Sequence, residues 1–377
     1  MRLLVCAGGT GGGVYPAIAV LQAVEEIHKT NKNDVCEILW VGSEQGMEKE
    51  LVVRELFTYR SIPAAGVHGV GLRALPKNVW KVMRGIFAAR SIIKEFKPDV
   101  MFFTGGYVAF PVAIAGFRIP KLVFVPDIEP GFALKLISGM ADQIAVSVDA
   151  TKAYFSAKKH TVVTGYPTRE TLTYWDKELA LTTFRWNKEY PVLLVVGGSL
   201  GAHSINRALI SVLEDLLQEM RIIHITGKRD WTELNEIKNS LPPDLKDRYQ
   251  AFDYLHELMG TALTAADLVL SRGGASCLGE YPLFGLPAII VPYPHAWRYQ
   301  KLNAEYLVEK GAALILPDEE LPMRIKEVVL SLMRNKTRRK RMAHAMFSLR
   351  KPNSALNIAE LLYRMAEKHD GEEVTYG

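Results

Sequence analysis

The sequence has few cysteines, and none of them are paired at metal-binding spacing. Its 377 residues include three cysteines, Cys6, Cys36 and Cys277, and no Cys-x-x-Cys motif. Three scattered cysteines do not form the disulfide framework of a small secreted protein, and they give no basis for a zinc site. We therefore expect three reduced, buried thiols in a cytosolic protein.

Long apolar runs are also lacking. The uncharged run at residues 100–117 approaches the length of a membrane span, but Gly105-Gly106 and Pro111 interrupt it. We expect a buried strand, a loop and a helix there. The N-terminus leads directly into a strand pattern and lacks the regions of a signal peptide. With 49% hydrophobic and 23% charged residues, the composition is that of an ordinary soluble protein, and the length predicts two domains.

Two common phosphate-binding motifs are absent. A dinucleotide-binding G-x-G-x-x-G motif that starts at Gly9 would require glycine at Val14. The next strand pattern ends in Gly42-Ser43, without the acid that binds ribose in such enzymes. The sequence also has no Gly-Lys-Ser or Gly-Lys-Thr, which the P-loop requires. The N-terminal glycines therefore belong to neither motif.

Glycine-rich turns between a strand and a helix occur twice. The first strand, turn and helix are expected at 2–7, 8–13 and about 16–27, and the second set, about 190 residues later, at 191–196, 197–202 and from 204 onward. Such a turn lets backbone amides approach a phosphate or a sugar without obstruction by side chains. Repetition of this unit predicts an α/β fold with two Rossmann-like domains, whose parallel sheets face each other across a cleft.

Further strand patterns in the first half of the chain define the expected domains. They lie at 100–103, 121–125, 143–146 and 161–163. Each ends where a binding site would form at the edge of a parallel sheet. We expect a hinge at 165–169. The first domain would cover residues 1–165 and the second 166–350, with a final helix at about 354–368 that packs back on the first domain.

The stretch Ala266–Gln300 contains the strongest indication of a ligand site. It predicts a strand, a glycine turn, a helix and a strand at 268–270, 273–274, 275–284 and 288–291. Glu280 would lie one turn or more into this helix, where its carboxylate can accept two hydrogen bonds from ribose hydroxyls. An isolated helix glutamate is ordinarily solvated, but the adjacent glycines and the polar cluster 298–300 favour a ligand pocket. We expect Arg272 and Ser276 to line it as well.

Positive charge is concentrated in one segment. Residues 73–97 contain seven basic residues and one acidic residue, a net charge of +6, whereas the whole chain is net +5. Apolar residues recur there at helical spacing, which predicts a basic amphipathic helix that can lie on an anionic membrane. A packed helix with a solvated basic face is an equal alternative, and nucleic-acid binding is less favoured because no binding motif accompanies the charge. The candidate membrane contacts are Lys77, Trp80, Lys81, Arg84 and Phe87.

A second basic run, Arg334–Arg341, is interpreted as the solvated face of a helix.

Seven short segments occur in an order that resembles one protein family. They are GGTGG after the first strand, TGGYVAFP, GYPTR, GGSLGA, SRGGASCLGE, GLPAIIVPYP, and Gln300 followed by Asn303-Ala304-Glu305. Over nearly the whole chain they resemble the MurG family, bacterial transferases of cell-wall synthesis. Members add N-acetylglucosamine (GlcNAc) from UDP-GlcNAc to the undecaprenyl-linked muramyl-pentapeptide. The resemblance implies the GT-B fold and peripheral attachment to the cytoplasmic face of the cell membrane.

The resemblance also implies a donor site, with Arg169 and Ser199 near the diphosphate and the backbone at His256 on uracil. Glu280 would bind the ribose, and Gln300 would bind the sugar hydroxyls. Arg169 and helix-start amides would neutralise the charge on departing UDP without a metal, and the sequence contains no Asp-x-Asp for a divalent ion, so we expect no cofactor. The full donor set is Thr10, Gly11, Gly12, Arg169, Ser199, His256, Ala275, Ser276, Cys277, Leu278, Gly279, Glu280 and Gln300.

The acceptor side departs from the family pattern in two places. Gly13 stands where the family's first glycine loop ends in His, and residues 125–129 replace the family's His-Glu-Gln-Asn. An inverting transfer needs a base for the proton of the attacking hydroxyl. We assign this role to Asp127, with Glu129 as the second candidate, and a turn-forming role for Asp127 is an equal alternative. The acceptor-side candidates are Gly13, Tyr15, Gly105, Gly106 and Tyr107.

Other functions remain open from the sequence. A UDP-GlcNAc 2-epimerase would share the two-domain fold, but it would carry more carboxylates and histidines around the donor sugar. A related glycosyltransferase with a different lipid or small-molecule acceptor is a stronger alternative, because the acceptor loops are altered. A UDP-sugar-binding protein without catalysis is a third, since Gly13 replaces a family histidine.

Overall fold

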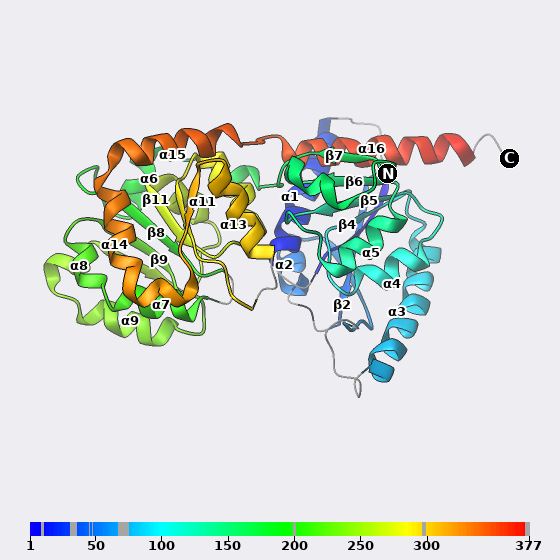
Figure 1. Ribbon diagram of the computed structural model, residues 1–377. Coiled ribbons are helices and arrows are strands. Elements are labelled where there is room, and N and C mark those ends of the chain that lie inside the picture. The colour runs from blue at the N-terminus through cyan, green and yellow to red at the C-terminus, as the bar shows by residue number, and fades with distance from the viewer. Residues whose placement is uncertain are drawn as a thin grey trace. The chain divides into compact units, whose positions relative to one another are not determined.

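The computed structural model describes residues 1–8, 11–30, 36–44, 46, 48–66, 75–198, 201–295 and 299–373. The chain forms two compact units, which are both visible in Figure 1. Unit 1 comprises Met1–Arg169 and Pro352–Gly377, and unit 2 comprises Glu170–Lys351. The sequence placed this boundary between residues 165 and 166.

Unit 1 is built on a seven-stranded parallel sheet with strand order β3-β2-β1-β4-β5-β6-β7. The central strands are runs of β-branched and aromatic residues that are buried on both faces, as expected for a parallel sheet covered by helices. The strands are β1 (Arg2–Cys6), β2 (Glu37–Ser43), β3 (Thr58–Ile62), β4 (Val100–Phe103), β5 (Lys121–Val125), β6 (Gln143–Val146) and β7 (Thr161–Val163).

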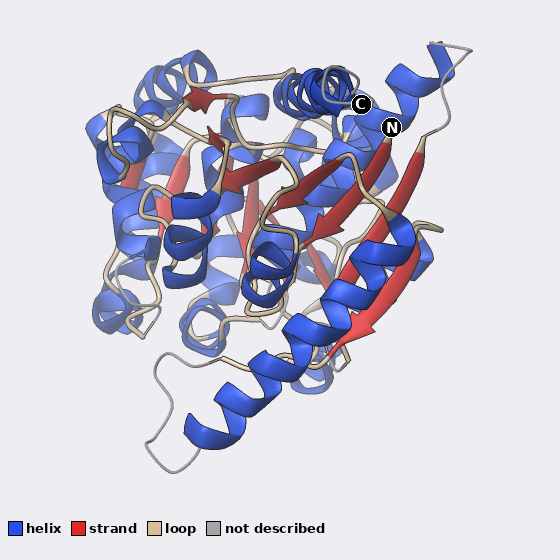
Figure 2. Cartoon of the chain, turned by 90° about the vertical axis from the view of Figure 1, so that its right-hand side faces the viewer, coloured by secondary structure: helices blue, strands red, loops and turns tan. Residues whose placement is uncertain are grey.

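Helices cover both faces of this sheet (Figure 2). They are α1 (Gly11–Thr30), α2 (Glu48–Arg54), α3 (Leu75–Phe96), α4 (Ala109–Ala115), α5 (Phe132–Met140) and α16 (Ser354–Glu373), with 3-10 turns at Asp149–Tyr154 and Glu170–Thr173, the latter in unit 2. The long helix in front in Figure 2 is α3, which buries Ala89 and Ile92 in the core and projects beyond the sheet. The C-terminal α16 packs against α1, where the Tyr363 hydroxyl donates to the Val24 carbonyl at 3.3 Å.

Unit 2 is built on a six-stranded parallel sheet with strand order β10-β9-β8-β11-β12-β13. Its strands are β8 (Val192–Val196), β9 (Arg221–Ile225), β10 (Tyr249–Phe252), β11 (Leu268–Ser271), β12 (Ala288–Ile290) and β13 (Ala313–Ile315). Its helices are α6 (Lys177–Thr183), α7 (His203–Ile210), α8 (Leu213–Leu217), α9 (Trp231–Ser240), α10 (Pro243–Lys246), α11 (Met259–Ala265), α12 (Glu280–Phe284), α13 (Tyr299–Glu309), α14 (Leu321–Arg334) and α15 (Lys336–Ser348), with 3-10 turns at Ala275–Leu278 and Asp318–Glu320.

Both sheets reverse their strand order at one point, between β1 and β4 in unit 1 and between β8 and β11 in unit 2. In open α/β sheets, ligands bind outside the carboxyl ends of the strands at such a point. The predicted α/β class with two parallel sheets is confirmed, and β4 to β7 have the predicted bounds. The uncharged run at 100–117 forms β4, a loop and α4, as expected. Among the described residues, no helix is long and apolar enough to cross a bilayer.

Two predicted helix boundaries are wrong. Helix α1 begins at Gly11 and not at Pro16, so Gly11, Gly12 and Gly13 form its first turn. Glycine disfavours helices in isolation, but Thr104 here donates a hydrogen bond to the Gly13 carbonyl and so supports the turn. The predicted helix 275–284 is a 3-10 turn followed by the short α12, because Gly279 has non-helical dihedrals (φ −126°, ψ −52°). Glu280 is therefore the first residue of a helix, not a residue one turn inside it.

Candidate functional site

In unit 1, the loop after β4 packs directly on the first glycine turn. The Thr104 amide donates to the Cys6 carbonyl at 3.3 Å, and the Thr104 hydroxyl donates to the Gly13 carbonyl at 2.7 Å. Gly106 has φ +89°, and a Cβ there would lie 2.9 Å from the carbonyl carbon of Gly8. Only glycine fits this approach, because both the dihedral and the contact exclude a side chain. The structure thus brings Gly13, Gly105 and Gly106 together at the carboxyl edge of the sheet.

Gly13 is closely packed. A Cβ at this position would lie 3.2 Å from the Thr104 carbonyl oxygen and 3.3 Å from its hydroxyl. Thr104 therefore occupies the space beside the position where the family resemblance places a histidine. Its neighbours Gly11 and Gly12 lie in the same first turn of α1, whereas Thr10 lies outside the described residues.

Two residues that the sequence assigned to different substrates are neighbours. The Arg169 guanidinium lies 5.3 Å from the centroid of the Tyr15 ring, within the range of a cation–π contact. Tyr15 in turn lies beside Gly11, whose Cβ position is 3.3 Å from the ring edge. Tyr107, at the end of the β4 loop, is 55% exposed and forms part of the surface of unit 1. The Arg169 guanidinium is thus positioned by its contact with Tyr15 of α1.

The two candidate bases follow β5. Asp127 and Glu129 are both half-buried in the turn between β5 and α5. The Ser147 hydroxyl donates to the Pro126 carbonyl at 2.8 Å, and the Thr151 hydroxyl lies 3.4 Å from the Asp127 carbonyl. Two backbone carbonyl groups therefore hold this turn to the segment that follows β6. These two hydrogen bonds do not involve the carboxyl groups of Asp127 and Glu129.

Sequence reasoning missed Glu48, a buried carboxylate beside the first glycine turn. Its Oε1 accepts hydrogen bonds from the amide and hydroxyl of Ser43, both at 2.9 Å. Its Oε2 is buried and has no hydrogen-bond partner among the described residues, and Oε1 lies 3.0 Å from the Cβ position of Gly8. Burial first, and the Glu48 charge second, raise the pKa of the Cys6 thiol. No sequence signal distinguishes Glu48 from an ordinary glutamate at a helix start.

In unit 2, Arg272 follows β11 and connects three elements. Its guanidinium donates to Asp318 at 2.5 Å, to the Ser204 hydroxyl at 2.7 Å and to the Val291 carbonyl at 3.2 Å. The Arg272 side chain is only 10% exposed. The sequence predicted that Arg272 lines a pocket, and the structure shows that its donors hold α7 and the turn at Asp318 to the end of β11.

The turn after Arg272 carries most of the predicted donor residues. Ala275, Cys277 and Leu278 are buried, whereas Ser276, Gly279 and Glu280 are half-buried. The buried members shape the turn, so the half-buried members are the ones that can reach a ligand.

Gln300 lies beside this turn. A Cβ on Gly273 would be 2.4 Å from the Gln300 carbonyl, and the Asn303 side-chain amide donates to the Gly273 carbonyl at 2.9 Å. The Gln300 side-chain oxygen accepts from the Tyr293 amide at 2.9 Å. The start of α13 is thereby fixed against the β11 turn. The assignment of Gln300 to the donor sugar stays a prediction.

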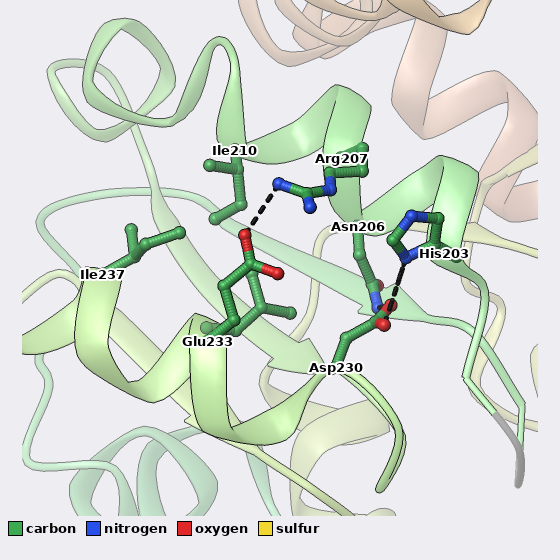
Figure 3. Close-up of a pocket in the computed structure, with 8 residues that line it drawn as sticks. His203, Asn206, Arg207, Ile210, Asp230, Glu233 and Ile237 are labelled. Carbon is green, nitrogen blue, oxygen red and sulfur yellow. Dashed lines mark hydrogen bonds and ion pairs between the residues drawn. The ribbon is translucent and has the colours of Figure 1, made fainter.

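The second glycine turn, between β8 and α7, is held by ionisable side chains. His203 begins α7, and its Nδ1 lies 3.1 Å from both oxygens of Asp230, which also accepts from Asn206 at 2.8 Å (Figure 3). The Asn206 oxygen lies 2.9 Å from Nε2 of the fully buried His224, whose Nδ1 lies 2.8 Å from the Tyr249 hydroxyl. Burial lowers the pKa of His224 to about 3, so this imidazole is neutral. Ser199, in the same turn, lies outside the described residues.

His256 lies on the loop that follows β10, at the same carboxyl edge of the unit 2 sheet. Its ring is exposed, and the ring centroid lies 4.4 Å from that of Tyr254. The backbone at His256 therefore belongs to the same edge as the turns after β8 and β11.

No disulfide joins the three cysteines, and Cys6 and Cys277 are buried as predicted. Cys36 is only half-buried, because it lies just before β2 and not within it. Within the described ranges, no group of three or more His, Cys, Asp and Glu side chains is arranged to hold a metal ion.

Comparison with known proteins gives matches in both units. Residues 3–146 match the glycosyltransferase family 28 N-terminal domain, and residues 192–361 match the glycosyltransferase family 28 C-terminal domain. A Roseiflexus sp. (strain RS-1) protein is 35% identical over 96% of this chain and 94% of its own. A Desulforamulus reducens protein is 33% identical over 97% and 99%. Both are named UDP-N-acetylglucosamine–N-acetylmuramyl-(pentapeptide) pyrophosphoryl-undecaprenol N-acetylglucosamine transferase.

Among solved structures, the MurG of Acinetobacter baumannii is similar, with a TM-score of 0.74 and 26% identity over 96% of this chain and 99% of that one. Together these matches confirm both the family resemblance and the GT-B fold class that the sequence predicted.

Proposed function

Because the chain belongs to the MurG family within glycosyltransferase family 28, we propose that it transfers GlcNAc from UDP-GlcNAc to the undecaprenyl-diphosphate-linked muramyl-pentapeptide of peptidoglycan synthesis. The observation that carries this proposal is that relatives named for this reaction match almost the whole chain, through both units. Cell shape and division depend on the polymer that such a product supplies.

The donor is assigned to the carboxyl edge of the unit 2 sheet. Glu280 and Ser276 are half-buried there, and Gln300 is fixed beside the same turn. A half-buried carboxylate at a helix start suits ribose hydroxyls, since it accepts two hydrogen bonds in a partly desolvated site. Backbone amides after β8 and β11 would neutralise the diphosphate, and Arg169 would add a positive charge as UDP leaves.

The acceptor is assigned to the carboxyl edge of unit 1, where Asp127 and Glu129 follow β5. The base takes the proton from the attacking sugar hydroxyl. At the same time the oxygen of that hydroxyl bonds to the anomeric carbon of GlcNAc. The bond to UDP breaks, and its electron pair leaves on the diphosphate. Attack opposite the leaving group inverts the configuration. No metal is needed in this scheme, because Arg169 and backbone amides offset the developing charge.

Asp127 is our choice for the base, and Glu129 is the matched comparison. The Asp127→Asn variant should lose on the order of 10²- to 10⁴-fold in kcat, because the amide cannot accept the proton. The Glu129→Gln variant should retain most activity. An unchanged kcat for Asp127→Asn at saturating substrates would show that this assignment is wrong.

The lipid-linked acceptor also calls for contact with a membrane, and α3 is our candidate. Its exposed apolar side chains are Val79 (48%), Trp80 (66%), Met83 (45%) and Phe87 (63%). Lys77, Lys81 and Arg84 are exposed along the same helix. Such a helix can bury its apolar side chains among lipid headgroups while its basic residues pair with anionic lipids. Neutralising Lys77, Lys81 and Arg84 should therefore lower sedimentation with anionic vesicles, and unchanged sedimentation would reject this role for α3.

The proposed function is tested by UDP release from UDP-GlcNAc, with and without the lipid-linked acceptor, in the presence of EDTA. Acceptor-dependent release together with a disaccharide product is expected. Conversion of UDP-GlcNAc to its epimer without acceptor would identify an epimerase. Donor binding without any turnover would identify a binding protein. UDP release that depends on a different acceptor would show that the proposed acceptor is wrong.

A further inference from the structure

The net positive charge of this chain comes from two segments, one in each unit. The segment 336–351 contains seven Lys and Arg residues and no Asp or Glu, so its net charge is +7. Residues 73–97 are net +6, and the whole chain is net +5. The rest of the sequence is therefore net −8. Five of the seven basic residues lie in α15, and Arg350 and Lys351 follow it. An excess of this size in one segment needs a different explanation from the scattered charges of an ordinary surface.

The basic side chains of α15 point outward. Helix α15 packs on α12 and α14 through the buried Met342 and Met346, and it runs along the outside of unit 2 (Figure 1). Lys336, Arg338, Lys340 and Arg341 are all exposed. Arg339 is the exception, because its guanidinium turns inward to the carbonyls of Leu332 and Met333 at the end of α14.

Neighbouring α14 shows what a solvated basic face looks like in this protein. Each of its exposed cations, Arg324, Lys326 and Arg334, is paired with a carboxylate. None of the four exposed cations of α15 forms an ion pair with another residue that the structure describes. Instead, Lys336 and Lys340 are spaced i, i+4, and Arg338 and Arg341 are spaced i, i+3, so like charges are adjacent. An anionic partner would relieve this repulsion.

We propose that this cationic face of α15, formed by Lys336, Arg338, Lys340 and Arg341, binds an anionic phospholipid surface as a second membrane attachment site. The inference rests on the proposed function, because that function places the acceptor in a bilayer. A convex helix face with unpaired charges along its length matches the diffuse charge of a lipid surface. Phe347 is 45% exposed at the end of the helix, with the Arg350 guanidinium 3.5 Å from its ring centroid, and adds an amphipathic contact.

The two attachment sites would differ in chemistry. Helix α3 offers four exposed apolar side chains with its basic residues, whereas the four defining residues of the α15 face are all cationic. Binding through α15 should therefore be mainly electrostatic and steeply salt-dependent, because exposed charges are screened within about 8 Å at physiological salt. Two weak sites on one chain raise its overall affinity for a membrane when both engage it at once.

The test is sedimentation of the full-length protein with vesicles of phosphatidylglycerol and phosphatidylcholine at about 50 mM salt. The triple variant Lys336→Gln, Lys340→Gln, Arg341→Gln should lose on the order of 10- to 100-fold in partition coefficient. The matched control is Lys188→Gln, Lys310→Gln, Lys326→Gln, which removes the same charge from exposed positions of unit 2 outside α15. An equal loss in both triple variants, or no loss in the first, overturns the inference.

A second comparison separates α15 from α3. In the Trp80→Ala, Phe87→Ala background, adding the α15 substitutions should lower the remaining vesicle binding further, and about 500 mM salt should remove it. If the α15 substitutions leave all vesicle binding unchanged but abolish binding to a DNA duplex, the face belongs to nucleic acid and the inference is wrong. The vesicle assay uses no donor or acceptor. If the wild-type protein transfers no GlcNAc to a short-chain, water-soluble acceptor, the proposed function is wrong. That result would not affect the outcome of the vesicle assay.

Discussion

The glycine turn after β1 in unit 1 and the glycine turn after β8 in unit 2 follow the same order of strand, glycines and helix, but different contacts support them. In unit 1 the support is close backbone packing, with Gly106 against Gly8, and a neutral hydrogen bond from Thr104. Glu48, a carboxylate beside that turn, is buried against Ser43.

In unit 2 the support includes two networks of charged or ionisable side chains. His203 and Asp230 begin the network that leads through Asn206 to the buried His224. The second network joins Arg272, Asp318 and Ser204. The turn in unit 2 also has close backbone approaches, since a Cβ on Gly201 would lie 2.4 Å from the Thr226 carbonyl oxygen and a Cβ on Gly197 would lie 2.4 Å from the Ala202 amide nitrogen. A shared sequence pattern therefore predicts a shared backbone shape. The surrounding chain decides whether the turn is stabilised mainly by close packing or also by charged side chains.

The largest effect is expected from added volume in unit 1. The Gly106→Ala substitution should destabilise unit 1 by roughly 2–5 kcal/mol, from a positive φ and a clash with the backbone of Gly8. Gly198→Ala is the control, because Gly198 has a similar φ of +85° but no described atom within 4 Å of its Cβ position. It should cost only about 1–2 kcal/mol. Hydrogen exchange of peptides from each unit measures the loss of stability in both variants. Equal losses would show that the close packing at Gly106 is not the cause.

The next effect concerns the ion pair of unit 2. Asp318→Asn should destabilise unit 2 by about 2–3 kcal/mol, because it leaves the mostly buried Arg272 guanidinium without its carboxylate. Asp215→Asn is the matched control, since it removes a surface partner of Lys326 and should cost about 0–1 kcal/mol. Urea denaturation of the two variants distinguishes them. A loss in the control as large as that in Asp318→Asn would argue against a special role for the network.

Acid should weaken unit 2 in particular, through His224. Its pKa is about 3 in the folded state, held down by burial, against about 6.5 when unfolded. A lowered folded-state pKa means that stability is fully present above pH 6.5 and is lost as pH falls from 6.5 toward 3. The loss should reach about 2 kcal/mol at pH 5. Thermal unfolding between pH 7 and 5 measures it. An unchanged melting temperature between pH 7 and pH 5 would refute this role of His224.

The smallest effect is expected at Gly13. Alanine favours a helix over glycine by about 1 kcal/mol, but its Cβ would press on Thr104, so Gly13→Ala should change stability by less than about 1 kcal/mol. Thr104→Ala removes the hydroxyl, which is one of the two atoms nearest to that Cβ. In that background Gly13→Ala should be more favourable than in the wild type, as a thermal melt of the double variant would show. A large loss in both backgrounds would mean that Thr104 is not the limiting contact.

The sequence predicted much of the fold because the relevant signals are local. The strands β4 to β7 are short apolar runs bounded by turn residues, and each was placed correctly. The strand β3 was missed, because Thr58–Ile62 has an exposed, polar composition at the edge of its sheet. The start of α1 was also misplaced, since the support for three glycines in a helix comes from Thr104, far away in the chain.

For the candidate site, the sequence by itself determined which residues occur at the strand ends, and so the family, the donor motif and the glycine turns. It could not determine which of them are neighbours. The Arg169 contact with Tyr15, the role of Arg272 as a link between α7 and the Asp318 turn, and the buried carboxylate of Glu48 were decided only by the tertiary structure. The physical reason is range: periodicity and turn chemistry act over a few residues, whereas these contacts join segments that meet only when the sheets assemble.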